Sequence, residues 1–211
     1  MDAKEPVVAQ INIDKKTGIL SIIILALVVI IAAMAFGSDR HDGVPGMHKD
    51  GMHSGDKSTS SKLSGADVMF LQMMIPHHQQ AVDISELAIT RSKDAELIAL
   101  ATVIRDGQAG EIIQMKNWLQ EAGSDMDMGH AGHDMGGMLT ESELSALRAS
   151  QGSAFDRLWL EGMTNHHNGA LHMTTMISDA QNPELRKFAE EIIEVQSAQN
   201  AQMKTMLSRL G

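Results

Sequence analysis

The chain contains no cysteine and no tyrosine, and aromatic residues make up only 3% of its 211 residues. Without cysteine it has no disulfide, no thiolate nucleophile and no cysteine-ligated zinc or iron–sulfur site. Its net charge of −10 argues against nucleic acid or an anionic lipid surface as the main partner, because both require clustered Lys and Arg. Cations are therefore the expected partners.

Two kinds of soft metal ligand are abundant instead. The chain has 17 methionines and 10 histidines, and core packing alone does not require so many methionines. The thioether carries no titrating proton, so it can bind Cu(I) in an oxidising or acidic compartment, while imidazole suits Cu(II) as well. The composition favours copper, Cu(I) above Cu(II), with silver and zinc as weaker alternatives.

An apolar run over residues 19–36 predicts a transmembrane helix. The run is uncharged, and its 18 residues would measure about 27 Å as a helix, which roughly spans a hydrocarbon core. Two lysines precede it, so residues 1–18 are expected to be cytoplasmic and the rest of the chain periplasmic or extracellular. Ala33-Met34-Ala35 resembles a signal-peptidase site, but the run exceeds the usual h-region of about 7–15 residues, which favours an uncleaved anchor over a cleaved signal.

Beyond this run the composition changes twice. Residues 37–64 are rich in Gly, Ser, Asp and Lys, which predicts a flexible linker, and they repeat a Met-His pair of candidate ligands at Met47-His48 and Met52-His53. Residues 65–211 show helical periodicity and predict a four-helix bundle. Helices are expected at about 66–91, 97–119 with Gly123 as the stop, 140–148, 154–180 and 183–210.

The second half of this domain repeats the first. A shift of 89 places Asp67, Phe70, Met74, His77, His78 and Ala81 on Asp156, Trp159, Met163, His166, His167 and Ala170, and a shift of 88 continues the match through the next helix. Because each half has the pattern of a helical hairpin, the two hairpins are expected to pack face to face with approximate two-fold symmetry. The His-His pairs would then share one interior.

Met74-Ile75-Pro76-His77-His78 is the sharpest local motif. Proline inside a helix removes a backbone donor, so the helix is expected to bend where the histidines begin. Each His-His pair has a methionine four residues before its second member, on the same helix face. The candidate ligands in the bundle are Met74, His77, His78, Met163, His166 and His167, with His172, Met173 and Met176 further along the third long helix.

Both residue types also have an ordinary structural interpretation. The histidines can be core residues hydrogen-bonded to carbonyls or to a carboxylate, and methionine is a common flexible core filler. Met69, Met115, Met203 and Met206 are expected to fill the core in this way. Hairpin geometry would nevertheless place Met115 near Met69 and Met203 near Met163, so a methionine cluster at one end of the bundle is the alternative.

The loop over residues 124–139 carries methionines that packing does not explain. It contains Met126, Met128, His130, His133, Met135 and Met138, separated by glycines that disfavour a helix. Exposed methionine is costly and oxidisable, so this string predicts a copper or silver site in preference to one for magnesium, calcium or manganese. A low-complexity linker is the alternative.

The sequence lacks the motifs of several enzyme classes. No helix contains Glu-x-x-His, so a ferritin-like di-iron centre is not expected. Gly-x-Ser-x-Gly and phosphate-binding loops are absent, which leaves hydrolase and nucleotide-dependent functions unsupported. The protein is therefore expected to bind rather than to catalyse. The alternatives are a copper-dependent redox enzyme such as a cuprous oxidase, and a helical interaction module that binds no metal.

These motifs resemble one known family, the exported Met- and His-rich helical proteins grouped as domain of unknown function 305. The resemblance covers about residues 65–210, and it is most specific over 70–81, with its Met-x-Pro-His-His core, and over 155–170. It implies a ferritin-like four-helix fold and copper binding linked to copper tolerance, with the Met and His residues of the two motifs as candidate ligands. Asn165 stands where many copies of the motif carry proline, so the second site is expected to differ from the first.

The resulting hypothesis is a membrane-anchored, extracytoplasmic copper-binding protein. It would sequester copper or exchange it with a donor or acceptor protein. The loop methionines and histidines would capture the ion, and the bundle would hold it.

Overall fold

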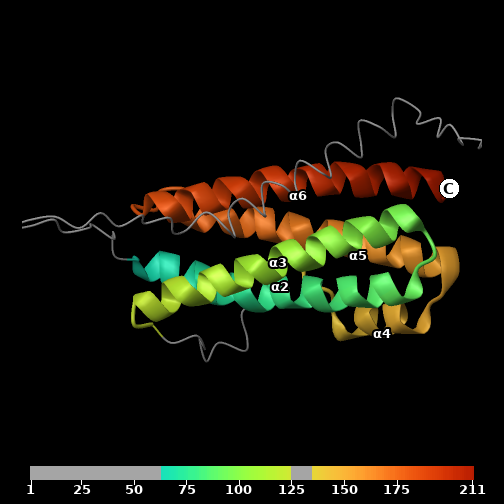
Figure 1. Cartoon of the computed structure of the whole chain (residues 1–211), viewed down its shortest axis with the longest axis horizontal. Helices are drawn as coiled ribbons and strands as arrows, with labels where there is room; N and C mark the ends of the chain where they lie inside the picture. The colour runs from blue at the N-terminus through green and yellow to red at the C-terminus, as the bar shows by residue number, and fades with distance from the viewer. Residues whose placement is uncertain (1–62, 125–134) are drawn as a thin grey trace, which may run out of the picture. The chain divides into compact units, whose positions relative to one another are not determined.

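The computed structural model describes residues 63–124 and 135–211, and all regular structure within them is helical. The long helices are α2 (Gly65–Arg91), α3 (Ala95–Glu121), α5 (Gly152–Met173) and α6 (Pro183–Arg209), which form an elongated bundle (Figure 1). The shorter α4 (Glu141–Ala149) precedes α5, and the 3₁₀ helix η1 (Thr174–Ile177) follows it. The predicted all-α architecture is confirmed.

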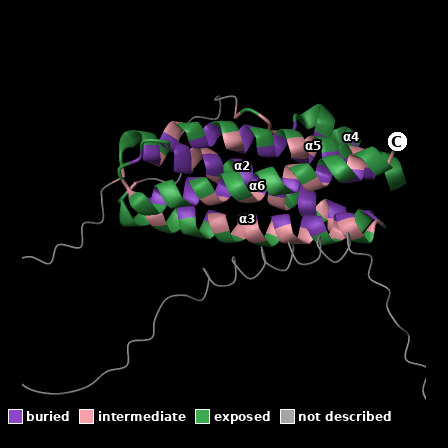
Figure 2. Cartoon of the chain, turned by 90° about the horizontal axis from the view of Figure 1, so that it is seen from above, coloured by how far each residue is buried: buried purple, intermediate pink, exposed green. Residues whose placement is uncertain are grey.

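The long helices pair as two hairpins. α2 packs along α3, α5 packs along α6, and the hairpins meet chiefly through α2 and α5 (Figure 1). Buried and exposed residues alternate along each long helix (Figure 2). Since α2 and α5 carry the two His-His pairs, the fold brings the repeated motifs against each other, as the internal repeat predicts.

Side-chain caps begin three of the four long helices, α2, α3 and α6. Ser64 and Asp67 form a capping box at the start of α2. Asp94 caps α3 by accepting hydrogen bonds from the backbone N–H groups of its first turn, and Asn182 caps α6 in the same way. Each such cap contributes about 1 kcal/mol by satisfying backbone donors that have no partner inside the helix.

The third long helix ends earlier than its periodicity predicts. The prediction of one helix over 154–180 is wrong, because α5 ends at Met173 and continues as the tighter η1. The Thr174 hydroxyl donates to the Leu171 carbonyl at 2.8 Å, and the Thr175 hydroxyl donates to the His172 carbonyl at 2.7 Å. Such hydroxyls compete with the helical hydrogen bonds and favour a tightened last turn.

Two apolar clusters divide the core along the bundle. The α4-side cluster combines α4 with the second half of α2, the start of α3, the first half of α5 and the end of α6. The η1-side cluster combines η1 with the opposite parts of the same long helices. The large buried side chains are Trp159, Phe155, Leu160 and Ile104 in the first and Phe70, Leu71, Leu119 and Phe188 in the second. Each cluster is built from both hairpins, so neither hairpin has a separate core.

The core methionines are shared between the clusters. Met163, Met203 and Met206 belong to the α4-side cluster, whereas Met74, Met115 and Met173 belong to the η1-side cluster. Met69, which was expected to fill the core, is 39% exposed. The described methionines therefore do not gather at one end of the bundle, because the two hairpins run so that equivalent residues fall in opposite halves.

The end of the Met-rich loop is fixed on α2 and α5. Leu139 is buried, its N–H donates to Gln80 Oε1 at 2.7 Å, and its carbonyl accepts from Gln80 Nε2 at 3.0 Å. The backbone at Gly136 and Gly137 lies directly on that of Gly169, where a Cβ would collide with the Gly136 carbonyl oxygen. Gly137 has a φ of 88°, which side-chain-bearing residues rarely adopt. These contacts hold the loop end across the middle of the bundle.

None of the helices within 63–124 and 135–211 is both long and apolar enough to cross a bilayer. The predicted cytoplasmic segment at 1–18, the predicted anchor at 19–36 and nearly all of the predicted linker at 37–64 lie outside the described residues. Those three predictions stay predictions.

A methyl group at Gly169 should separate the loop end from α5. We expect Gly169→Ala to lower the free energy of unfolding by about 1–3 kcal/mol, the usual cost of overpacking, even though alanine favours the helix. Urea denaturation followed by circular dichroism measures the change. Gly110→Ala is the matched control, because a Cβ at this exposed helical position meets nothing within 4 Å, and it should stabilise by about 0.5–1 kcal/mol. Equal effects of the two substitutions would contradict the close approach.

Candidate metal centre

The four histidines of the repeated motifs form one buried layer between the two apolar clusters. On α2, His77 and His78 lie between the buried residues of the η1-side cluster and those of the α4-side cluster. On α5, His166 and His167 lie between the same two sets in the reverse order. All four are fully buried. The ring centroids of His77 and His166 are 3.8 Å apart, and each lies 6.4 Å from the ring of its own neighbour in sequence. We call these four rings the imidazole layer.

Every ring in the layer makes its hydrogen bond through Nε2, and every partner is an oxygen. Two partners are backbone carbonyls, because His77 Nε2 lies 3.3 Å from the Gly136 carbonyl and His166 Nε2 lies 2.9 Å from the His77 carbonyl. The other two are side chains, with His78 Nε2 2.7 Å from Glu111 Oε2 and His167 Nε2 2.7 Å from Gln199 Oε1. Since these oxygens accept, Nε2 carries the proton in each ring.

The opposite ring nitrogen is therefore the lone-pair nitrogen of each neutral ring. The Nδ1 atoms of all four histidines are buried and have no hydrogen-bond partner among the described residues. A buried polar atom without a partner costs about 1–3 kcal/mol, so its presence requires an explanation, and a bound ion is one such explanation. A neutral imidazole whose second nitrogen is already hydrogen-bonded is also the form that ligates metal ions.

Burial holds these rings in the neutral form. It lowers the pKa of His77 to about 3 and that of His167 to about 4, and in both cases the nearby His78 ring lowers it further. The pKa of His166 also falls well below the ordinary value, chiefly through burial and then through the adjacent His77 and His167 rings. These imidazoles stay available to a metal ion in neutral and mildly acidic solution, because protonation does not compete for the lone pair.

The other predicted ligands on the helices lie apart from the layer. Met74 and Met163 are buried on opposite sides of it, one in each apolar cluster. Met173 and Met176 pack in or against the η1-side cluster, and His172 is exposed. Among the described residues, no group of three or more His, Asp or Glu side chains has the arrangement of a metal site. The ligand roles of these residues stay predictions. The alternative interpretation of the layer histidines, as core residues hydrogen-bonded to carbonyls or to a carboxylate, agrees with the contacts of His77, His78 and His166.

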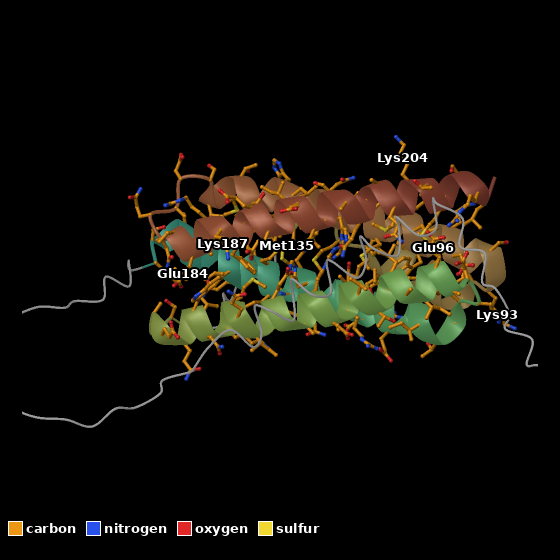
Figure 3. The ribbon with its side chains drawn as sticks, turned by 45° about the horizontal axis from the view of Figure 1, so that its top comes forward. Lys93, Glu96, Met135, Glu184, Lys187 and Lys204 are labelled. Carbon is orange, nitrogen blue, oxygen red and sulfur yellow. The ribbon has the colours of Figure 1, made fainter. Side chains whose placement is uncertain are left out.

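The described part of the Met-rich loop borders the layer. Met135 and Met138 are half-buried, and the Gly136 carbonyl between them accepts the His77 hydrogen bond. Met135 lies near the middle of the bundle, between Glu184 and Lys187 toward one end and Lys93 and Glu96 toward the other (Figure 3). The remaining predicted ligands of the loop and linker lie outside the described residues, namely Met126, Met128, His130, His133, Met47, His48, Met52 and His53.

The polar partners of the layer were not predicted from the sequence. Glu111 and Gln199 contact the imidazoles, while Gln108 and Gln196 are buried on the same two helices and have side-chain atoms without partners among the described residues. A signal was present, because the shift of 88 that relates the second helices places Gln108 on Gln196 and Glu111 on Gln199. Their interior position could be recognised only with the hairpin register in hand.

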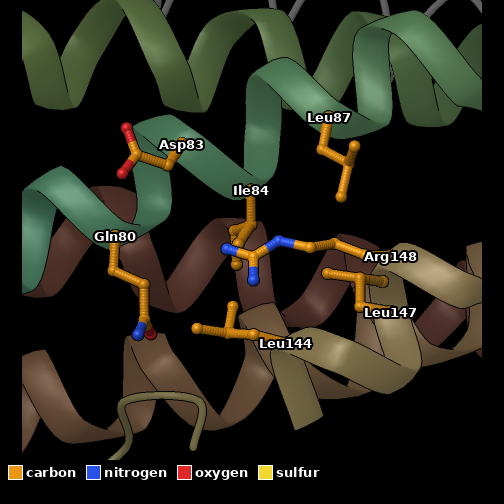
Figure 4. A pocket seen from close by; sticks show the side chains of 7 residues that line it. All are labelled: Gln80, Asp83, Ile84, Leu87, Leu144, Leu147 and Arg148. Atoms are coloured by element: carbon orange, nitrogen blue, oxygen red, sulfur yellow. The ribbon is translucent and has the colours of Figure 1, made fainter. Parts of the chain in front are cut away.

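A pocket beside α4 contains none of the predicted ligands. It lies between α2 and α4 and is lined mainly by Ile84, Leu87, Leu144 and Leu147 (Figure 4). Its lining contains no histidine or methionine.

Acid should destabilise the bundle through the layer. The pKa of His77 and of His167 is lower in the folded protein than the ordinary value of 6.5, so the unfolded chain binds more protons between that value and the folded pKa. Stability is then fully present above about pH 6.5 and is lost as the pH falls. We expect each of these histidines to reduce the free energy of unfolding by about 2 kcal/mol between pH 8 and pH 5.

Urea denaturation of the metal-free protein at several pH values measures this slope. His172→Gln is the control, because His172 is exposed and its removal should leave the slope unchanged. A free energy of unfolding that is the same at pH 8 and pH 5 would show that the buried rings are not held neutral.

Comparison with known proteins identifies relatives of the helical bundle. The family model of the Domain of unknown function (DUF305) matches residues 67–207. A putative secreted DUF305 protein from Streptomyces coelicolor is 30% identical, with a TM-score of 0.64 over 69% of this chain and 94% of that one. A DUF305 fragment from Deinococcus radiodurans is also 30% identical, with a TM-score of 0.64 over 70% of this chain and 99% of that one.

CopM in its Cu(II)-bound form is 35% identical, with a TM-score of 0.58 over 68% of this chain and 97% of that one. An uncharacterized protein of Acanthamoeba polyphaga mimivirus is 40% identical over 55 residues, and the match spans 26% of this chain and about a third (36%) of that protein. The family match covers most of the chain, and the structural matches include its helical bundle. The chain belongs to the DUF305 family.

Proposed function

We propose that this protein binds copper outside the cytosol, held to the membrane by residues 19–36, and that it sequesters the ion or passes it to another protein without catalysing a reaction. The observation that carries the proposal is the set of buried Nδ1 atoms in the imidazole layer, which have no partner among the described residues. Burial lowers the pKa of three of these rings, His77, His166 and His167, and neutral imidazoles suit a soft cation because they need not release protons to bind it.

The type of ligand supports copper over harder metals. Imidazole binds copper in both oxidation states and thioether favours Cu(I), whereas magnesium, calcium and manganese prefer oxygen ligands. Within the described residues the layer offers one unpartnered nitrogen from each of four rings, and the half-buried Met135 and Met138 lie on either side of the Gly136 carbonyl that His77 contacts. An ion captured by loop thioethers would therefore reach the imidazoles over a short path.

The relatives support the same ion. CopM has been solved in Cu(II)-bound, Cu(I)-bound and Ag-bound forms, and these are 33–35% identical to this chain. Both oxidation states of copper and the monovalent silver ion are thus compatible with a related bundle. For this chain we infer the same class of cation and place it at the layer.

Removing the four buried rings should abolish copper binding by the bundle. In the variant with His77, His78, His166 and His167 replaced by Gln, glutamine keeps a side-chain donor at each position and leaves no cavity as large as alanine would. We expect Cu(I) affinity at the nitrogen-ligated site to fall by at least about a hundredfold. Competition with a chromophoric chelator measures affinity, and copper X-ray absorption counts the nitrogen and sulfur ligands.

The matched control carries the same substitution at the remaining histidines, His41, His48, His53, His130, His133 and His172. It should keep the nitrogen-ligated copper that the first variant loses. Circular dichroism of both metal-free variants checks that the bundle is helical. If the first variant is folded and binds copper as tightly as the unmodified protein, with the same nitrogen count, the layer is not the metal site.

A further inference from the structure

The two halves of the imidazole layer differ in one charge. His78 and His167 are equivalent in the repeat, and so are their partners on the following helices. His78 Nε2 lies 2.7 Å from a carboxylate oxygen of Glu111, whereas His167 Nε2 lies 2.7 Å from the amide oxygen of Gln199. The geometry is the same and the distance is the same, so the formal charge on the partner is the difference.

Glu111 is also the one acidic group that the described residues place in contact with the layer. The groups that hydrogen-bond the four rings are the Gly136 and His77 carbonyls, the Glu111 carboxylate and the Gln199 amide. No other carboxylate forms an ion-pair contact with a histidine within 63–124 and 135–211. The Glu111 side chain is 24% exposed, so solvent reaches this partner of the buried layer.

A cation in a buried neutral layer needs a compensating charge, because burying an unpaired ion is strongly unfavourable. A carboxylate that accepts the N–H of a ligating imidazole supplies this charge, fixes the tautomer and makes the opposite nitrogen a better donor. Its attraction for the ion grows in proportion to the charge of the ion. It therefore favours a divalent ion more than a monovalent one.

On the basis of the proposed function, we propose that Glu111 is a positioning residue that makes Nδ1 of His78 the first copper ligand of the layer and sets the balance between Cu(II) and Cu(I). The half of the layer around His167, whose partner is uncharged, takes the ion second. The two halves of the repeat thus differ in the residue that hydrogen-bonds the ligating imidazole, and not in the imidazole itself.

Glu111→Gln tests this with little change of shape, because the Gln199 pair shows that an amide accepts the same hydrogen bond at the same distance. The test is made in the full chain with glutamine at the six histidines outside the layer. We expect affinity to fall about tenfold for Cu(I) and about a hundredfold for Cu(II). A tenfold difference between the two ions corresponds to a midpoint potential higher by about 59 mV.

The matched control is Glu121→Gln, which removes the same charge from an exposed position at the end of the same helix. It should leave both affinities within about twofold, since exposed charges are largely screened. Unfolding of the metal-free variants in urea shows whether either substitution acts through stability. Equal losses for the two copper ions in Glu111→Gln, or the same result for Glu111→Gln and Glu121→Gln, would overturn the role of the charge.

The order of filling has a separate readout. With one equivalent of Ag⁺, nitrogen NMR of the ¹⁵N-histidine-labelled protein should shift Nδ1 of His78 before that of His167, and Glu111→Gln should remove this preference. First filling at His167 would overturn the inference and leave the proposed function intact. Failure of the layer to bind Ag⁺ or copper in the unsubstituted Glu111 protein would instead refute the proposed function, and with it the inference.

Discussion

The hydrogen bonds from the imidazole Nε2–H groups to oxygen acceptors determine the chemistry at the centre of this molecule. An oxygen at each Nε2 leaves Nδ1 as the lone-pair atom of each ring, and burial keeps three of the rings neutral by lowering their pKa. The same contacts join the parts of the fold. The His166 ring reaches the backbone of α2, the His77 ring reaches the loop end, and the other two rings tie each helix to its hairpin partner. The hydrogen bonds that fix the tautomers of the rings therefore also hold the helices and the loop end together.

The apolar clusters on either side offset the free-energy cost of burying this polar layer. Each contains residues from both hairpins, so the hydrophobic stabilisation of the two halves must overcome the cost of the polar atoms between them. The loop end closes the layer from the side because Gly169 has no Cβ to keep the Gly136 carbonyl away. A larger residue there would separate the carbonyl from α5 and, with it, from the His77 ring. The glycine of the helix and the glycine of the loop thus contribute to the polar centre without offering a ligand.

Much of this architecture follows from patterns that the sequence displays directly. The 3.6-residue period predicts the long helices, and the repeat predicts that His77 and His78 meet His166 and His167. The end of α5 is not predictable in this way, because periodicity does not register the hydroxyls of Thr174 and Thr175 that tighten the last turn. Glu111 and Gln199 have no local motif either. Each is recognisable as a partner of an imidazole only when the register of its hairpin places it one helix away from the ring it contacts.

The methionines show why the type of ligand is easier to predict than its place. Met74 and Met163 share a helix face with the histidines, so spacing alone assigns them to the same site. In the bundle the two-fold symmetry that joins the His-His pairs places these methionines on opposite sides of the layer. Each is buried in a different apolar cluster. The loop instead places Met135 and Met138 on either side of Gly136, whose carbonyl His77 contacts. A pseudo-two-fold arrangement can gather only residues close to its axis. It brings the rings of His77 and His166 within 3.8 Å and separates whatever lies a turn further along each helix.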